Sequence, residues 1–178
     1  HTRARPFAGP LASCLHDLCM ASCMDLHTDE KIPGGIDLGF VDIIGFATLV
    51  DSLSAVKKCV YEDKTVTMDE LIRALDDDFE GHEALRLTRA PRFGNNDMYA
   101  DSIGLAVDRA TQEYCHKYAP ETGLHIDIRT VSVTANVPHG KEVGALPCGR
   151  KAWMPFSDGS SPAQGADLNG PTQSIISN

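Results

Sequence analysis

The chain has 178 residues, which is long enough for one domain with a substantial core. Its 16 basic and 25 acidic residues give a formal net charge of −9, and no basic stripe is visible, so nucleic acid is not an expected partner. We find neither a signal peptide nor an apolar run near the roughly eighteen residues of a membrane-spanning helix, so no membrane association is expected. The six cysteines show no CxxC spacing, which favours a reduced chain in the cytoplasm.

The first ten residues contain two prolines and a glycine and predict an entry loop. Residues 11–25 place leucines and cysteines at helical spacing and predict one amphipathic helix. Within it, His16, Cys19 and Cys23 lie three and four residues apart on one face, and both residue types can bind zinc. A structural zinc site needs a fourth ligand and none is evident, so we favour packing of small thiols in a core. A small metal-binding helical domain remains a minor alternative.

A glycine-rich stretch, residues 27–40, precedes a predicted helix over Gly45–Lys58, whose first glycine is expected to permit close packing. Further on, Thr67 and Glu70 form the Thr-x-x-Glu pattern of a capping box, which predicts that a helix starts there. Three aspartates follow at 76–78. They would point in different directions on a helix, so a solvated face is favoured over a divalent-metal site.

The middle of the chain predicts two more helices. The first is short, within residues 80–89. The run Gly94–Asp97 is typical of a turn, because glycine and asparagine accept left-handed φ. A helix is predicted to follow over Met98–Tyr118 until Pro120–Gly123 breaks it. One side of that helix is expected to be buried through Ile103, Val107, Ala110, Tyr114 and Tyr118.

The segment 131–172 has the most unusual composition, with six of the fifteen glycines and five of the ten prolines. Valines and an alanine alternate with polar residues over Val131–Val137 and predict a half-buried strand. Regularity then stops at Pro138. The only tryptophan and several large apolar residues lie among the later glycines, which argues against a solvated linker. We therefore predict a strand followed by a long ordered loop over 131–178, and long ordered loops are often functional.

The common catalytic motifs do not occur in the sequence. Gly140-Lys141 lacks the preceding Walker spacing, and Gly159-Ser160 runs into a proline rather than forming a nucleophile elbow. His139 has no evident acid partner. The residues alone therefore predict a globular scaffold with an ordered loop and indicate no reaction.

The run NVPHGKEVGALPCGRKAWMPFSDGSSPAQGADLNGPT, from Asn136 onward, resembles the late region of the glycyl radical enzymes, the family that includes pyruvate formate-lyase. SDGSSP and NGPT are more similar to the diol-dehydratase and C–X lyase branch. The resemblance extends upstream through GFATLVDSLSAVKK, which begins at Gly45, and APRFGNND, which begins at Ala90. It covers nearly the whole chain.

That resemblance implies an α/β fold, in which helices wrap a barrel of parallel strands. Residues 1–178 would be one incomplete segment of the barrel, mostly helical, with one or a few strands and the long ordered Gly/Pro-rich C-terminal loop. Family members carry a thiyl-forming cysteine in a Gly-Cys-x-Glu context and a radical glycine in an Arg-Val-x-Gly-Tyr context. A separate S-adenosylmethionine iron–sulfur activating enzyme installs the radical. Neither motif occurs in this sequence, so no catalytic residue is expected in this chain.

The function implied by the resemblance is part of an anaerobic radical lyase or dehydratase that breaks a C–O, C–N, C–S or C–C bond of a small molecule. Its partners would be the remainder of the barrel, the activating enzyme and, at full length, a second copy. The chain would then be a piece of a longer reading frame and inactive alone. A degenerate gene product, acting as a silent remnant or a binding module, is the alternative.

Three residues are candidates for substrate contact. The resemblance places Val131 and Val133 on a strand whose apolar side chains line the pocket, although ordinary core packing is an equally good interpretation of either valine. Asp37 lies in a loop where relatives often carry substrate-touching residues. It could orient a hydroxyl or ammonium group, although an aspartate that caps its own backbone is a simpler reading.

Overall fold

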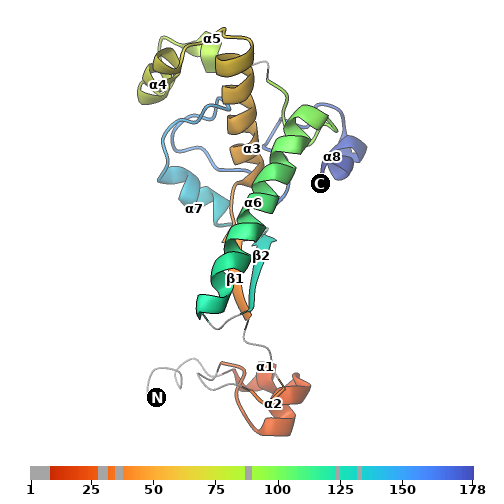
Figure 1. The fold of residues 1–178 in the computed structure, drawn as a ribbon. Coiled ribbons are helices and arrows are strands. Elements are labelled where there is room, and N and C mark those ends of the chain that lie inside the picture. Colours follow the sequence, from red (N-terminus) through yellow and green to blue (C-terminus); the bar gives the residue numbers. More distant parts are fainter. Residues whose placement is uncertain (1–8, 28–31, 35–37, 87–89, 123–124, 132–133) are drawn as a thin grey trace. The chain divides into compact units, whose positions relative to one another are not determined.

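A computed structural model describes residues 9–27, 32–34, 38–86, 90–122, 125–131 and 134–178. The chain divides into two compact units, His1–Phe40 with His116–Asp127, and Val41–Cys115 with Ile128–Asn178. Figure 1 shows the elements of both. No helix in the described ranges is long and apolar enough to cross a membrane.

The first unit begins with two short helices, α1 (Pro10–Cys14) and α2 (Asp17–Ser22), where one helix over 11–25 was predicted. That prediction is wrong because the chain becomes extended at His16, with φ −114° and ψ 114°, and α2 ends at a left-handed Cys23. Cys19 is buried, as expected of a core thiol, whereas His16 and Cys23 are exposed. Among the described residues, no group of three or more His, Cys, Asp or Glu could hold a metal ion.

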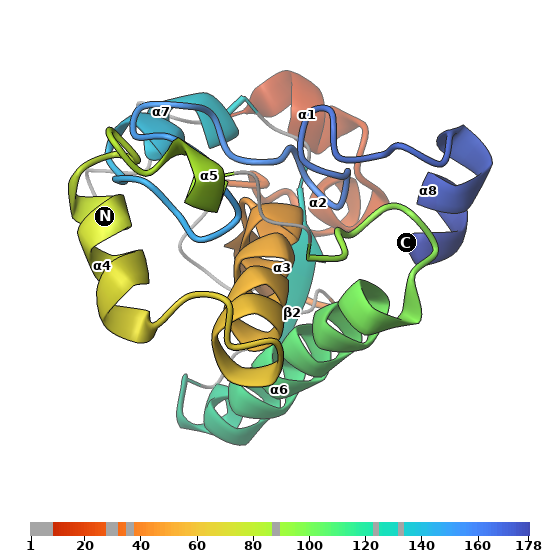
Figure 2. The same cartoon turned by 90° about the horizontal axis from the view of Figure 1, so that it is seen from above.

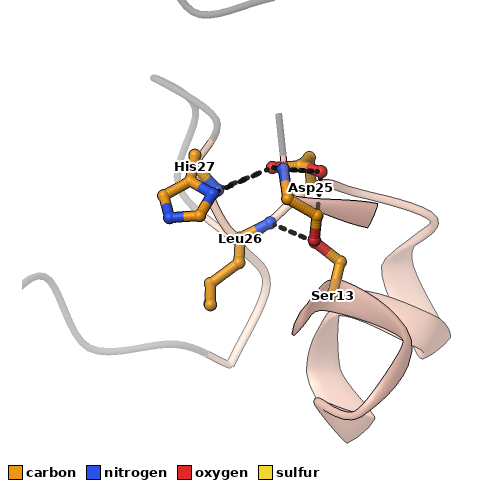
Figure 3. Close-up of polar contacts among 5 residues, drawn as sticks. Ser13, Asp25, Leu26 and His27 are labelled. Atoms are coloured by element: carbon orange, nitrogen blue, oxygen red, sulfur yellow. Dashed lines mark hydrogen bonds and ion pairs between the residues drawn. The ribbon is translucent and has the colours of Figure 1, made fainter. Parts of the chain in front are cut away.

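The Asp25 side chain is the centre of a group of hydrogen bonds that joins the residues after α2 to α1, as Figure 3 shows. Its carboxylate accepts hydrogen bonds from the Gly9 N–H at 3.1 Å, the His27 N–H at 2.8 Å and the Ser13 hydroxyl at 3.1 Å. Ser13 Oγ in turn accepts from the Leu26 N–H at 2.9 Å. The N–H donors of His27 and Gly9 stabilise the charged form and lower the pKa of Asp25.

Two strands, β1 (Leu38–Ile43) and β2 (His125–Thr130), form the sheet of the described chain. Arg129 on β2 pairs with Asp42 on β1, with 2.9 Å between Nη2 and Oδ1. The strand was predicted at Val131–Val137. The structure instead ends β2 at Thr130 and forms helix α7 over Asn136–Lys141.

Both parts of that correction have a local cause. Ile126 and Ile128 already alternate with polar residues, so the period of two starts earlier than the prediction assumed. Pro138 falls in the first turn of α7, where its missing N–H has no intrahelical partner and its fixed φ suits a helix.

The second unit is built on α3 (Phe46–Ala55), which continues into a π-helical segment, η2 (Val56–Glu62). Its core joins α3 to α6 (Met98–Thr122), and Figures 1 and 2 show these helices side by side. Phe46 and Phe93 meet edge to face, with ring centroids 5.6 Å apart. The core consists of Phe46, Ala47, Val50, Phe93 and Ala100, with Ile43, Ile103 and Val107 packed against it.

Three smaller helices complete the second unit: α4 (Met68–Asp76), α5 (Glu83–Arg86) and α8 (Pro171–Ser177). The predicted capping box is confirmed, since the Glu70 N–H donates to Thr67 Oγ1 and the Glu70 carboxylate accepts from the Thr67 N–H. The predicted burial along α6 is right for Ile103 and Val107, which pack against the core, but wrong for Ala110 and Tyr114, which are exposed, Tyr114 to 66%. Helix α6 also continues beyond Pro120 to Thr122, because a proline in a last turn removes only one backbone bond near a frayed end.

Candidate functional site

The Gly/Pro-rich segment lies against the first turns of α3 through a reciprocal pair of hydrogen bonds. The Thr48 N–H donates to Ser157 Oγ at 3.1 Å, and the Ser157 N–H donates to Thr48 Oγ1 at 2.8 Å. Both residues are buried. Thr48 is in the first turn of α3, where backbone N–H groups have no intrahelical acceptor, so Ser157 satisfies a donor that the helix itself cannot.

Gly45, just before α3, makes this approach possible. It has φ +80°, and a Cβ there would lie 3.0 Å from Cβ of Phe156. The close packing predicted for this glycine is therefore confirmed. On its other side, Phe156 exchanges bonds with Asn136: the Phe156 N–H donates to the Asn136 carbonyl, and Asn136 Nδ2 donates to the Phe156 carbonyl, each at 3.2 Å.

Arg150 stabilises the turns of the Gly/Pro-rich segment through hydrogen bonds to its backbone. Its guanidinium donates to the backbone carbonyls of Gly140, Val143, Gly144 and Met154. The same group lies 4.6 Å from the centroid of the Phe156 ring, within the range of a cation–π contact. Burial lowers the pKa of Arg150, yet an arginine stays charged at any physiological pH. The loop is thus stabilised by charge-assisted hydrogen bonds from one side chain to four backbone carbonyls.

Two further side chains join this segment to the rest of the unit. Asn95 Nδ2 donates to the Ala166 carbonyl at 2.7 Å, and its Oδ1 accepts from the Leu168 N–H at 2.8 Å. Asp78 Oδ1 accepts from the Ala152 N–H at 2.7 Å. The sequence interpretation of Asp78 as part of a solvated face is therefore wrong, because its carboxylate faces a backbone donor 74 residues away.

Between α3, the side chains of Arg86 and Arg92 and this segment lies a cavity of about 440 Å³. Among the described residues, its lining includes four cations, Arg86, Arg92, Arg150 and Lys151, and one carboxylate, Asp51. The apolar part comes from residues 154–156. A small organic molecule fits a cavity of this size.

Asp51, on the buried side of α3, is 2% exposed. Its Oδ1 accepts the Phe93 N–H at 2.8 Å, and its Oδ2 has no hydrogen-bond partner among the described residues. Burial raises the pKa of Asp51 to about 6, although the Phe93 N–H and the charge of Arg92 oppose that rise. The Oδ2 atom of this buried carboxyl group can therefore still form a hydrogen bond with a ligand in the cavity.

The structure gives only partial information on the residues predicted to touch substrate. Val131 is half-buried and directly follows β2. Val133 and Asp37 lie outside the described residues. Their proposed role in lining a pocket stays a prediction.

Sequence analysis missed the residues that make the cavity. Asp51 could have been found as the one acid on the α3 face that carries Ala47, Val50 and Ser54, all buried. Arg150 and Lys151 stood within the segment singled out for its glycines, but their chemistry was not weighed. Nothing in the local sequence indicates that Arg86 and Arg92 reach the same space.

Comparisons with known proteins agree with this architecture. A family model described as pyruvate formate lyase-like matches residues 4–140. The isethionate sulfite-lyase of Oleidesulfovibrio alaskensis is 54% identical over 180 residues, covering 100% of this chain and 22% of that protein. The trans-4-hydroxy-L-proline dehydratase of Clostridioides difficile is 34% identical over 171 residues, covering 94% of this chain and 21% of that protein.

Among solved structures, the glycerol-bound B12-independent glycerol dehydratase of Clostridium butyricum superposes with a TM-score of 0.77 at 29% identity, covering 98% of this chain and 22% of the other. The chain therefore spans about a fifth of the length of the relatives that it matches. Since the family model matches well over half of its residues, the chain belongs to the pyruvate formate lyase-like family.

Proposed function

We propose that this chain serves a glycyl radical lyase that cleaves the C–S bond of a small hydroxyalkyl sulfonate, with isethionate as the first candidate. The observation that carries the proposal is the 54% identity to an isethionate sulfite-lyase along the entire chain, against 34% to a hydroxyproline dehydratase. Because the matched stretch is 22% of that lyase, the chemistry needs residues outside this chain.

In this proposal residues 1–178 are one segment of the barrel and work with its remainder, in a cytoplasmic homodimer without nucleic-acid or membrane partners. A glycyl radical, installed on a glycine outside this chain by an S-adenosylmethionine iron–sulfur activating enzyme, supplies the hydrogen abstraction that starts the reaction. The segment itself contributes walls and positioning. The Thr48–Ser157 bonds join the Gly/Pro-rich loop to α3, and the Asn136–Phe156 bonds join it to α7.

Val131 and Val133 are proposed to form an apolar wall that keeps water from the reacting centre. Val131 is half-buried next to β2, which is compatible with such a wall. Asp37 is proposed to accept a hydrogen bond from the substrate hydroxyl, since an ionised carboxylate can only accept.

The test is sulfite release from isethionate by the complete gene product under anaerobic conditions, after treatment with an activating enzyme. We expect turnover, and we expect Val131→Glu or Val133→Glu to lower kcat/KM at least about tenfold, a change of about 1.4 kcal/mol in transition-state stabilisation. Thr134→Glu, at an exposed position, is the matched control and should leave kcat/KM unchanged.

Normal turnover by both valine variants would refute the wall. Absence of sulfite release, with dehydration of a diol or of hydroxyproline instead, would refute the sulfonate assignment. A gene product that lacks the cysteine and glycine motifs would instead support the alternative of a silent remnant or binding module.

A further inference from the structure

The cavity next to α3 has a charge opposite to that of the chain as a whole. The chain carries −9, yet the described lining of this space contains four cations and one carboxylate. None of the four cations forms an ion pair with a described carboxylate. Asp51 balances part of this charge, since Arg92 acts on it electrostatically, but positive charge remains in excess in the described lining and would attract an anion.

The four cations are not equally free to bind a ligand. The N–H donors of Arg150 form hydrogen bonds with loop carbonyls, so this residue stabilises the loop rather than binding a ligand. Arg86 donates only through Nε, to the Gly149 carbonyl at 3.1 Å, and Arg92 only through Nη2, to the Cys148 carbonyl at 3.0 Å, among bonds between described residues. A guanidinium has five N–H donors, so most of those on Arg86 and Arg92 remain available.

Among the described residues, each arginine is bonded to one carbonyl of the loop through a single nitrogen. Its other nitrogens can bind an oxyanion, and a guanidinium can bind one in a bidentate manner. Lys151 adds a third positive charge to the lining from the loop itself.

Asp51 adds a titratable group to the same cavity. Its Oδ2 is buried at the wall of the same cavity and has no partner among the described residues. Burial raises the pKa of Asp51 to about 6, so below that pH this oxygen can donate one hydrogen bond to an oxyanion while Oδ1 stays with the Phe93 N–H. Above that pH the ionised carboxylate can only accept, and the cations alone attract the anion. The apolar surface of Met154, Pro155 and Phe156 would contact the organic part of the ligand.

We propose that this cavity is a binding site for a small organic oxyanion, such as an alkyl sulfonate, phosphonate or carboxylate, whose charged head is bound by Arg86, Arg92 and Lys151. The inference rests on the cavity and does not require the proposed function. A volume of about 440 Å³ exceeds what an inorganic sulfate needs, which favours a ligand with a carbon chain.

The test uses the complete gene product with ethanesulfonate as probe, and ethyl methyl sulfone as a neutral ligand of similar shape. Arginine modification by phenylglyoxal is followed at each residue by peptide mass mapping. We expect ethanesulfonate to slow modification of Arg86 and Arg92 at least about fivefold, while the sulfone gives no protection. Arg109, exposed on α6 and outside the cavity, should react equally in all samples.

Calorimetric titration with ethanesulfonate then compares Arg92→Gln/Lys151→Gln with the control Arg109→Gln. The double variant should lose the binding event at this site, or weaken it at least about tenfold, and the control should retain it. Protection at Arg86 and Arg92 with inorganic sulfate equal to that with ethanesulfonate would overturn the organic-ligand part. Equal modification with and without ethanesulfonate would overturn the site, whatever the outcome of the isethionate assay.

Discussion

Replacing Asp51 by Asn should stabilise the protein at neutral and alkaline pH. Asp51 is 2% exposed and has one hydrogen bond, from the Phe93 N–H to Oδ1. Burial raises its pKa from 3.8 to about 6. The folded protein therefore keeps a proton on Asp51 in a pH range in which the unfolded chain has lost it.

The sign follows from proton linkage. Between pH 3.8 and about 6 the folded state binds more protons at Asp51 than the unfolded state, so its contribution to stability falls as pH rises through this window. At about 1.4 kcal/mol for each pKa unit, the ionised carboxylate costs about 3 kcal/mol above pH 6 relative to pH 4. Asparagine keeps the acceptor for Phe93 and carries no charge. We therefore expect a gain of about 1–2 kcal/mol at pH 8, since an amide N–H without an acceptor offsets part of the relief.

The assay is urea unfolding of wild type and Asp51→Asn at pH 4.5 and pH 8, with Asp76→Asn, an exposed aspartate at the end of α4, as the control for net charge. The difference between variant and wild type should grow by about 2 kcal/mol from the lower to the higher pH. If that difference is the same at both pH values, or if Asp51→Asn is less stable at pH 8, the reasoning about this carboxylate is refuted.

Of three further experiments, two test the loop contacts and one tests the exposed apolar surface. Gly140→Ala should cost about 1–3 kcal/mol of unfolding free energy, because the new Cβ would collide with the Met154 carbonyl and the Pro155 backbone. Gly144→Ala is the control and should be neutral, because a Cβ there has nothing within 4 Å. Equal stability of the two variants in urea would contradict the packing at Gly140. Ser157→Ala should cost about 1–3 kcal/mol of unfolding free energy, because the buried Thr48 N–H loses its acceptor. The control Ser161→Ala, at an exposed position, should cost nothing measurable in the same assay. A Ser157→Ala variant as stable as wild type would refute the contribution of the Thr48–Ser157 hydrogen bonds. Expressed alone, the 178-residue chain should self-associate through apolar side chains such as Leu49 and Leu53, which are 44% and 41% exposed; a single monomeric species in sedimentation velocity would contradict this.

Local chemistry predicted the elements that depend on neighbours in sequence. The capping box of Thr67 and Glu70 joins residues three apart, and the structure shows both of its bonds. Gly45 was expected to permit close packing, although the sequence could not say that Phe156 would be the neighbour. The strand before the Gly/Pro-rich segment was expected too late, because the valines at 131–137 hid the earlier alternation of Ile126 and Ile128.

The cavity depends on contacts that no local pattern encodes. Thr48 meets Ser157 across 109 positions, and Asp51 meets Phe93 across 42. Whether a buried aspartate is paired, and whether an arginine binds a carbonyl or a ligand, is decided by tertiary neighbours at such separations. Arg86 illustrates this, since its guanidinium donates to the carbonyl of Gly149, 63 positions away.

The central claim is that this chain serves a glycyl radical lyase, and electron paramagnetic resonance of the complete gene product tests it most directly. After anaerobic treatment with an activating enzyme and S-adenosylmethionine, we predict a glycine-centred radical signal that decays when oxygen is admitted. A sample that gives no such signal, with an activating enzyme that loads a known isethionate sulfite-lyase in parallel, would contradict the claim.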